Sequence, residues 1–258
     1  MQKFQDFFNQ LLGMPVLASE AGAGTDRLIA YIHALMFALF IGWLIYFVYA
    51  LWRFNARRNP KADHIGVKNH ASSYLEVAVA GIEGVLLIFV AVPLWARAVD
   101  KFPAKADATV VYVVAQQFAW NIRYADKEGN IGRQDMKFVS EANLFGIDPT
   151  DAEHTNAVQT LNEFHVPINK PVIAYISSKD VIHSFKLVAF RVTQDAIPGM
   201  RVPVHFMPNR LGKYQIYCAQ LCGNGHANMA GGRIVVESED DYKKWLASKT
   251  TTAPVSYE

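Results

Sequence analysis

Cysteine is scarce in this 258-residue sequence, which contains two, and the net charge is only +2. Basic residues gather in one short stretch rather than along a stripe, which argues against a nucleic-acid-binding protein. The first 24 residues lack a charged segment followed by a clean apolar core, so they do not predict a cleavable signal peptide. No internal repeat is found. With 52% hydrophobic and 19% charged residues, the chain is not expected to be disordered.

Hydrophobic residues are concentrated in two runs, of which the first covers residues 28–52. This run, LIAYIHALMFALFIGWLIYFVYALW, carries no formal charge over 25 positions. As a helix it would extend about 38 Å at roughly 1.5 Å per residue, enough to cross a hydrocarbon core of about 30 Å with some tilt. Tyr31 and Trp52 lie at its ends, as interfacial anchors do. A buried helix of a soluble protein rarely has so long a charge-free run, so we expect a transmembrane span.

The second run, residues 76–96, begins with Glu76 and is interrupted by Glu83. A carboxylate at membrane depth is costly unless it is protonated or paired, so Glu83 should face protein rather than lipid. A helix packed on a soluble core is the alternative. We favour a second span, because this run is joined to the first by a short polar loop.

The polar loop between the two runs sets the expected orientation. It carries five basic residues against the single acidic residue Asp63, namely Arg53, Arg57, Arg58, Lys61 and Lys68. The positive-inside rule places this loop in the cytoplasm. The N-terminus and everything after about residue 97 then lie on the outer side of the membrane.

The rest of the chain has a different pattern. Segments 109–126, 171–187 and 212–220 are rich in β-branched and aromatic residues with partial alternation, broken by Gly, Pro, Asn and Asp. Segment 231–249 predicts one more strand and then a short helix that starts near Ser238 or Glu239. Residues 130–159 are polar and weakly patterned, and we expect a long surface excursion there. An all-β sandwich or small barrel is therefore predicted after the helical hairpin.

These patterns predict four parts in chain order. They are an outer-face segment at 1–26, a transmembrane hairpin at 27–97 with spans at about 28–52 and 76–96, an all-β domain at 98–248, and a C-terminal tail at 249–258.

Both cysteines lie in the stretch CAQLCGNGHANM, residues 218–229. Because the outer side of a membrane is oxidising, a Cys218–Cys222 disulfide is one interpretation of this spacing. Such a bond would close a loop of only a few residues and would stabilise the fold little. It would also leave His226 and Met229 without a role.

A metal site accounts for more of these residues. Thiolate, imidazole and thioether are soft or borderline ligands, and together they suit copper better than calcium or magnesium. Such a site needs a further histidine, and His183 lies in a strand-like context 35 residues before Cys218. A single cysteine would indicate a mononuclear copper site. Two thiolates separated by three residues can instead bridge two copper ions, each of which also takes one histidine.

With these residues identified, the chain resembles subunit II of the heme–copper cytochrome c oxidases over nearly its whole length. The resemblance depends on the hairpin, on DVIHSFKLVAFRVTQDAIPGM at residues 180–200, and on the Cys-x-Gln-x-Cys-x-x-x-His-x-x-Met loop. It implies a transmembrane hairpin followed by a cupredoxin domain, on the outer face, that binds two copper ions in a binuclear centre called CuA. The ligands that the resemblance implies are His183, Cys218, the backbone carbonyl of Gln220, Cys222, His226 and Met229.

Gln220 departs from the family pattern. The family has a glutamate there, whose backbone carbonyl binds copper and whose carboxylate reaches a magnesium ion at the interface with the catalytic subunit. Glutamine is a neutral and weaker ligand for a hard cation. We therefore carry over the copper role of this position and doubt the magnesium site.

Three further positions gain expected roles from the resemblance. Phe118 stands where the family has a tryptophan that receives electrons, and Trp120 keeps a later tryptophan of the same aromatic run. Glu76 matches a glutamate that borders a proton-uptake path into the catalytic subunit. A core aromatic at Phe118 and a solvated helix-boundary carboxylate at Glu76 are the alternatives.

The resemblance implies the subunit at which electrons enter a respiratory heme–copper oxidase. It would accept them from a cytochrome c at the copper centre and pass them to heme in catalytic subunit I, where oxygen reduction is coupled to proton pumping. The sequence has no Cys-x-x-Cys-His motif, so the donor heme must belong to another protein. The spans contain a single histidine, His33, which is too few to hold a heme. The expected partners are subunit I, other oxidase subunits, a c-type cytochrome and the lipid bilayer of a bacterial-type plasma (inner) membrane, with the copper domain on the periplasmic face.

Other functions stay open at this point. A nitric oxide reductase-type complex would use the same copper site with a different catalytic partner. A copper-free quinol-oxidase subunit II would share the fold, lack the ligands and act structurally. A free-standing, membrane-anchored redox carrier is a further alternative. Copper content and the co-purified subunits would distinguish them.

Overall fold

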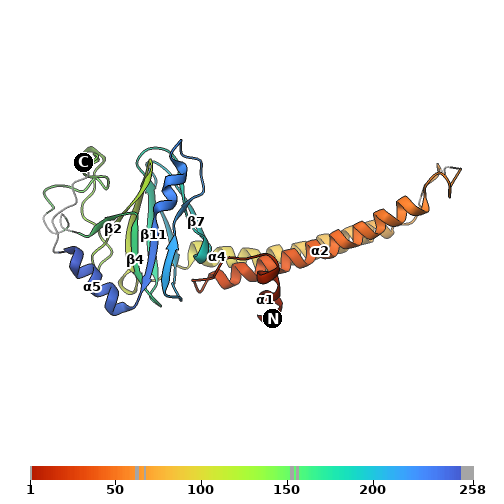
Figure 1. Cartoon of the computed structure of the whole chain (residues 1–258), viewed down its shortest axis with the longest axis horizontal. Coiled ribbons are helices and arrows are strands. Elements are labelled where there is room, and N and C mark those ends of the chain that lie inside the picture. Colours follow the sequence, from red (N-terminus) through yellow and green to blue (C-terminus); the bar gives the residue numbers. More distant parts are fainter. Residues whose placement is uncertain (1, 62–63, 67, 152–153, 155–156, 251–258) are drawn as a thin grey trace. The chain divides into compact units, whose positions relative to one another are not determined.

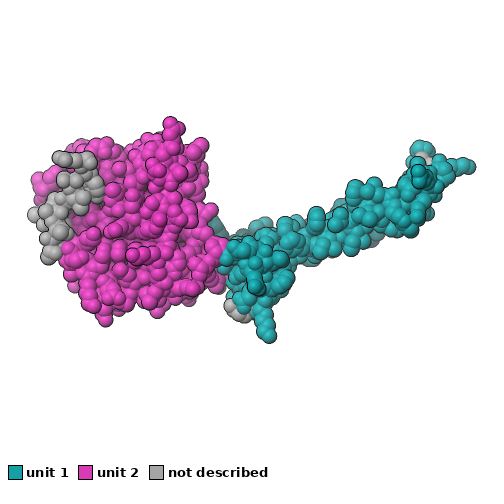
Figure 2. Space-filling view, viewed as in Figure 1, with its two compact units in different colours: residues 1–14, 24–97 teal, residues 15–23, 98–258 magenta. Residues whose placement is uncertain are grey.

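The computed structural model describes residues 2–61, 64–66, 68–151, 154 and 157–250. The chain forms two compact units, residues 1–14 with 24–97 and residues 15–23 with 98–258 (Figure 2). The first unit is helical and the second contains the strands. The four-part division expected from the sequence stays a prediction.

The helical unit contains two long helical runs (Figure 1). One is α2 (Gly22–Arg53), of 32 residues, and the other is the 30-residue run of α3 (Ala71–Leu86), a π-helical turn (Leu87–Ala91) and α4 (Val92–Asp100). A short helix, α1 (Gln2–Leu11), precedes them. Both runs are long and apolar enough to cross a membrane, and they extend beyond the expected limits of 28–52 and 76–96.

Proline explains the π-helical turn in the second run. Pro93 has no amide hydrogen, so the carbonyl of Phe89 loses the donor it would have in a regular helix, and the proline ring crowds that carbonyl. Widening the helix by one residue over Leu87–Ala91 accommodates both effects. The run therefore continues through the proline to Asp100.

The second unit is built from three sheets (Figure 1). One is five-stranded with the order β3-β2-β1-β5-β8, and two are three-stranded with the orders β10-β6-β7 and β4-β11-β9. The pairs β1–β5 and β4–β11 are parallel and the others are antiparallel. The strands are β1 (Thr109–Gln116), β2 (Ala119–Tyr124), β3 (Gln159–Leu161), β4 (Glu163–Pro167), β5 (Val172–Ser178), β6 (His183–Leu187), β7 (Val192–Ala196), β8 (Val202–Phe206), β9 (Gly212–Gln215), β10 (Tyr217–Cys218) and β11 (Arg233–Glu237).

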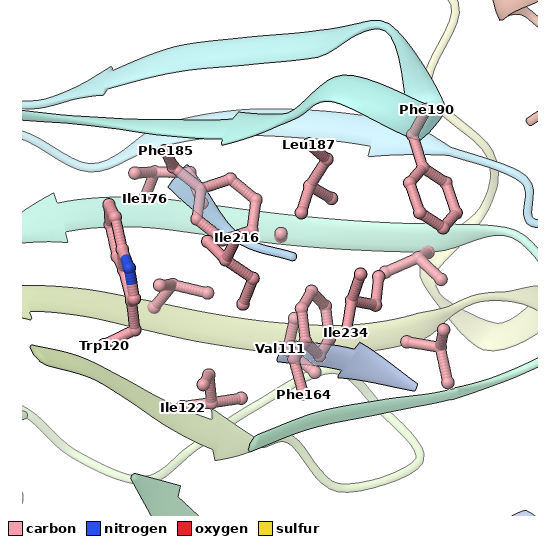
Figure 3. Close-up of a cluster of buried hydrophobic side chains, with 14 of the residues drawn as sticks. Val111, Trp120, Ile122, Phe164, Ile176, Phe185, Leu187, Phe190, Ile216 and Ile234 are labelled. Carbon is pink, nitrogen blue, oxygen red and sulfur yellow. The ribbon is translucent and has the colours of Figure 1, made fainter. Parts of the chain in front are cut away.

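The main core lies between the five-stranded sheet and the two smaller sheets (Figure 3). Successive side chains of a strand point to opposite faces, so Trp120 and Ile122 of β2 both point into this core. Phe185 of β6 meets the Trp120 ring edge-on at a centroid distance of 5.4 Å. The predicted hairpin followed by an all-β sandwich is confirmed.

The outer face of β1 is also buried, which the sequence did not indicate. Val110, Tyr112 and Val114 pack in a second cluster with apolar residues of the stretch predicted as a surface excursion, among them Phe145 and Ile147. This stretch covers the five-stranded sheet on the side away from the main core. Residues 152–153 and 155–156 of the stretch lie outside the described residues.

A short helix, α5 (Glu239–Thr250), follows β11. The hydroxyl of Ser238 accepts a hydrogen bond from the backbone N–H of Asp241 at 3.1 Å, which caps the first turn. Three acidic residues in that turn, Glu239 to Asp241, further favour a helix start here. The helix begins where the sequence predicted it.

Candidate metal centre

The five predicted side-chain ligands come from two places in the chain that strand pairing brings together. His183 is the first residue of β6, and Cys218 ends β10. These strands are antiparallel neighbours, with Cys218 opposite Phe185. The other three ligands follow in the next loop, Cys222 before and His226 and Met229 within the 3₁₀ helix η5 (His226–Gly231).

The ligand atoms converge on one small volume. The Sγ atoms of Cys218 and Cys222 are 3.9 Å apart. Nδ1 of His183 is 3.9 Å from Sγ of Cys218, and Nδ1 of His226 is 3.4 Å from Sγ of Cys222. The thioether sulfur of Met229 is 3.4 Å from Sγ of Cys222 and 3.1 Å from Nδ1 of His183.

The two sulfur atoms are not joined. A disulfide bond is about 2.05 Å long, roughly half of the observed separation, and both cysteines are free. His183 and Met229 are fully buried and Cys222 is 4% exposed, so most of the cluster is shielded from water. Burial, together with the neighbouring thiol of Cys218, raises the pKa of Cys222 to about 11. A bound cation would favour the thiolate, so metal binding there is coupled to loss of a proton.

A carboxylate orients the buried histidine. Oδ1 of Asp180 is 2.8 Å from Nε2 of His183, so the other ring nitrogen, Nδ1, faces the sulfur atoms. A carboxylate on the far nitrogen is the usual partner of a histidine ligand. Burial alone would raise the pKa of Asp180, but hydrogen bonds from His183 and from the backbone N–H groups of Gln117 and Val181 lower it.

Gln117 connects the two ligand-bearing segments. Its backbone N–H donates to Oδ2 of Asp180 at 2.7 Å, and its side-chain Nε2 donates to the carbonyl of Cys222 at 2.6 Å. Asp180 and Gln117 were missed from the sequence. A carboxylate three residues before a candidate histidine ligand was the available signal for Asp180, but no local pattern indicated Gln117.

The backbone of the cysteine loop also faces the cluster. The carbonyl oxygen of Gln220 lies 3.0 Å from Sγ of Cys218, while its side chain is exposed. Phe118 packs on the same loop. A Cβ atom added at Gly225 would fall 2.3 Å from Cδ2 of the Phe118 ring, so glycine is required for this close approach.

The remaining predicted residues differ in position. Trp120 is fully buried beneath the site, and its Nε1–H donates to the carbonyl of Met229 at 3.0 Å. Its ring is 6.3 Å from that of His183 between centroids. Phe118 is partly exposed. Glu76 belongs to α3 in the helical unit, and its role stays a prediction.

The donor set suits a soft or borderline metal ion. Two thiol sulfurs, two imidazole nitrogens, a thioether and a carbonyl converge, with His183, Cys218 and Cys222 placing their ligand atoms within 4.8 Å of one another. Copper prefers such sulfur and nitrogen ligands, and magnesium or calcium does not. The residues present therefore fit a copper site.

Known proteins are similar to this chain in sequence. The family described as cytochrome c oxidase subunit II, periplasmic domain, matches residues 109–239. The alternative cytochrome c oxidase subunit 2 of Bradyrhizobium diazoefficiens is 30% identical over 219 residues, which cover 84% of this chain and 77% of that protein. The cytochrome c oxidase subunit 2 of Cereibacter sphaeroides is 30% identical over 247 residues, covering 91% of this chain and 78% of that protein.

Solved structures are similar as well. The periplasmic domain of cytochrome oxidase subunit II from Bradyrhizobium japonicum is 27% identical, with a TM-score of 0.40, and the match covers 55% of this chain and 92% of that one. The family match alone spans more than half of the 258 residues. The chain belongs to the cytochrome c oxidase subunit II family.

Proposed function

We propose that this subunit, at which electrons enter a heme–copper oxidase, holds two copper ions between Cys218 and Cys222. The observation that carries the proposal is that the two sulfur atoms are 3.9 Å apart and each lies within 3.9 Å of a different imidazole nitrogen. The two thiolates would then hold the ions together with His183 and His226. Met229 and the Gln220 carbonyl would complete the ligand set.

The protein contributes rigidity and exclusion of water. When bound, a copper pair supplies one-electron redox chemistry. The ligands are held by antiparallel strands, by Asp180 on His183, and by Gln117 on the cysteine loop. Because these contacts fix both ligand segments, little rearrangement accompanies a change of charge at the site. Oxygen reduction and proton pumping belong to a heme-bearing partner.

Gln220 lies at the rim of the site. Its side chain is exposed and neutral, whereas its carbonyl faces Cys218. We infer that copper binding uses the carbonyl and that the side chain does not hold magnesium. A Gln220→Glu variant should then gain affinity for magnesium or manganese while its copper content stays unchanged.

Electrons arrive from a c-type cytochrome through Phe118 in this proposal. Phe118 is partly exposed and packs on the loop that carries Cys222 and His226. Trp120 is fully buried, so it acts behind the site by holding the backbone of Met229 and cannot contact a docking protein. Phe118→Ala should slow electron uptake from the cytochrome and leave the copper spectrum unchanged.

The chain is a membrane protein with a periplasmic domain, and we infer the bacterial inner membrane as its location. Five basic residues in 53–68 support a cytoplasmic loop between the spans. Glu76, in the second turn of α3, then lies near the cytoplasmic end of the second span, where a proton taken up for the catalytic subunit would enter. Its exposed side chain is accessible to a partner there.

Copper analysis of the purified oxidase complex tests the proposed site. Two copper ions per chain with one unpaired electron shared between them are expected by electron paramagnetic resonance. Cys222→Ser should abolish that signal. Gln220→Ala is the matched control and should keep it, because the backbone carbonyl remains. One copper with a single-ion spectrum, or no copper in the native complex, would contradict the proposal, and the latter would revive a copper-free structural role.

A further inference from the structure

The N-terminal helix α1 is attached to the first span by one of its faces. Phe8 is buried, and its ring stacks on that of Phe37 of α2 at a centroid distance of 6.4 Å. The ring of Phe4 lies 5.8 Å from that of Tyr31, also in α2. These contacts belong to a single compact unit, so α1 has a defined position on α2.

The exposed surface of α1 has an apolar side and a polar side. Phe4, Phe7 and Leu11 are 40%, 59% and 56% exposed, and their spacing of three and four residues places them on one side of the helix. The polar residues Lys3, Asp6 and Gln10 are exposed on another side. A helix that met only water would not present two aromatic rings and a leucine together.

The neighbours of α1 determine what covers the apolar side. Tyr31 and Phe37 lie in the N-terminal half of α2, which is the periplasmic half of the span because the periplasmic domain follows the second span. Farther along α2, Phe40 and Ile41 are 62% and 53% exposed, as a lipid-facing surface requires. The apolar side of α1 therefore lies next to the part of α2 whose apolar side chains are expected to contact lipid.

We propose that α1 lies in the periplasmic membrane interface and buries Phe4, Phe7 and Leu11 among the acyl chains of the outer leaflet. Lys3, Asp6 and Gln10 face the headgroups and water. A short amphipathic helix with aromatic residues on its apolar side is suited to this position. Its contacts with Tyr31 and Phe37 then fix the depth of α2 in the bilayer. This inference depends on the membrane position of α2 and not on the copper centre, so its failure leaves the proposed function intact.

Photocrosslinking of the intact oxidase complex tests the assignment. The complex is reconstituted in nanodiscs of phosphatidylethanolamine and phosphatidylglycerol with Phe7→p-benzoylphenylalanine, Leu11→p-benzoylphenylalanine or the control Gln10→p-benzoylphenylalanine. After irradiation, mass spectrometry of the chain should find phospholipid adducts at positions 7 and 11. The control at position 10 should give none. Phe8, which anchors α1 on α2, is retained in all three variants.

Three results would overturn the proposal. A crosslink from position 7 or 11 to another polypeptide would mean that a protein covers this side of α1. No adduct at these positions would mean that water does. Equal lipid adducts at position 10 would contradict the division into two sides.

A measurement on the native complex covers the case in which the variants do not assemble. A lipid-soluble diazirine should label Phe7 and Leu11, and a water-soluble diazirine should label Lys3 and Gln10. The reverse pattern, or labelling of both sides by the water-soluble reagent alone, would contradict the inference.

Discussion

The β-sheet unit buries its large hydrophobic side chains within the chain, whereas the helical unit does not. Trp120, Phe164 and Phe185 are fully buried by neighbouring strands. In α2, by contrast, Phe40, Trp43 and most neighbouring apolar residues are more than half exposed. In the most apolar segment of each long helical run, only 6% of the residues are buried in the first run and 0% in the second. The β unit therefore completes its own interior, and the helical unit is completed only by lipid and by other subunits.

The same difference separates the functional groups of the two units. The metal ligands in the β unit have partners from the chain itself, such as Asp180 on His183 and Gln117 on the cysteine loop. Glu76 and Glu83 in the helical unit have exposed side chains, and at membrane depth such groups need polar partners. Copper affinity should consequently depend on residues of this chain. The roles of Glu76 and Glu83 should depend on residues of another chain.

Removal of a direct ligand should have the largest effect. We expect Cys222→Ser to abolish copper binding and to lower oxygen consumption with reduced cytochrome c by more than about 100-fold, because losing a ligand exceeds the 10- to 100-fold cost of losing an outer partner. Heme content should be unchanged, since heme lies in a partner subunit. Copper retained at the wild-type level would show that the sulfur atoms do not hold it.

Loss of an outer partner should have the next largest effect. In Asp180→Asn the amide can no longer accept the His183 proton as a carboxylate does, so copper affinity should fall about 10- to 100-fold. Titration of the copper-depleted chain with copper in a competing chelator measures this. Glu141→Gln is the control, because Glu141 is an exposed carboxylate that forms an ion pair with Lys179. Equal affinities of the two variants would mean that the histidine is oriented without Asp180.

The sequence predicted those features that depend on local patterns. Partial alternation predicted the strands around Trp120 and Phe185, and the loop spacing predicted the ligands from Cys218 to Met229. His183 was also predicted, because the site needs a second histidine and His183 lies in a strand-like segment before the cysteine loop. The copper ligands as such stay a prediction until metal is measured.

Features that depend on non-local pairing could not be predicted. Gln117 reaches Cys222 across 105 positions, and only the folded sheets bring them together. Burial of both faces of β1 likewise depends on residues such as Phe145 and Ile147, which lie in a stretch without strand or helix periodicity. The contact between α1 and Phe37 of α2 is a third case, since a ten-residue helix gives no local sign of what it packs against.

A substitution in the membrane should have a smaller effect than either change at the metal site. Glu83 lies in α3 with an exposed side chain, so we expect its hydrogen-bond partner to come from another subunit. Hydrogen bonds between membrane helices contribute about 0.6–1.7 kcal/mol, so Glu83→Leu should weaken association with the heme-bearing subunit roughly threefold to twentyfold. Detergent titration of the complex measures this. Glu83→Gln, which can still form a hydrogen bond, should lie close to wild type, and a more stable Leu variant would place Glu83 against lipid.

The smallest effect should be a pH dependence of stability in the β unit. His154 lies between Asp151 and Asp126, with each ring nitrogen 3.0 Å from a carboxylate oxygen. Hydrogen bonds first to Asp151 and then to Asp126 raise the pKa of His154 above its usual 6.5. The pKa of Asp151 is lowered by the backbone N–H of Arg133 and by His154. Burial opposes the shift at Asp126, but hydrogen bonds from Asn130 and His154 lower its pKa as well.

These shifts define a pH window. The stabilisation from a raised histidine pKa is complete below about 6.5 and is lost as the pH rises through the raised value, and that from the two carboxylates is lost as the pH falls below about 3.8. Between pH 6 and 8.5 the Tm of the wild-type chain, followed by near-ultraviolet circular dichroism, should therefore decline relative to His154→Asn by a few degrees at most, as for other ion pairs near the surface. Parallel curves for the two proteins would show that no proton linked to folding is bound at His154.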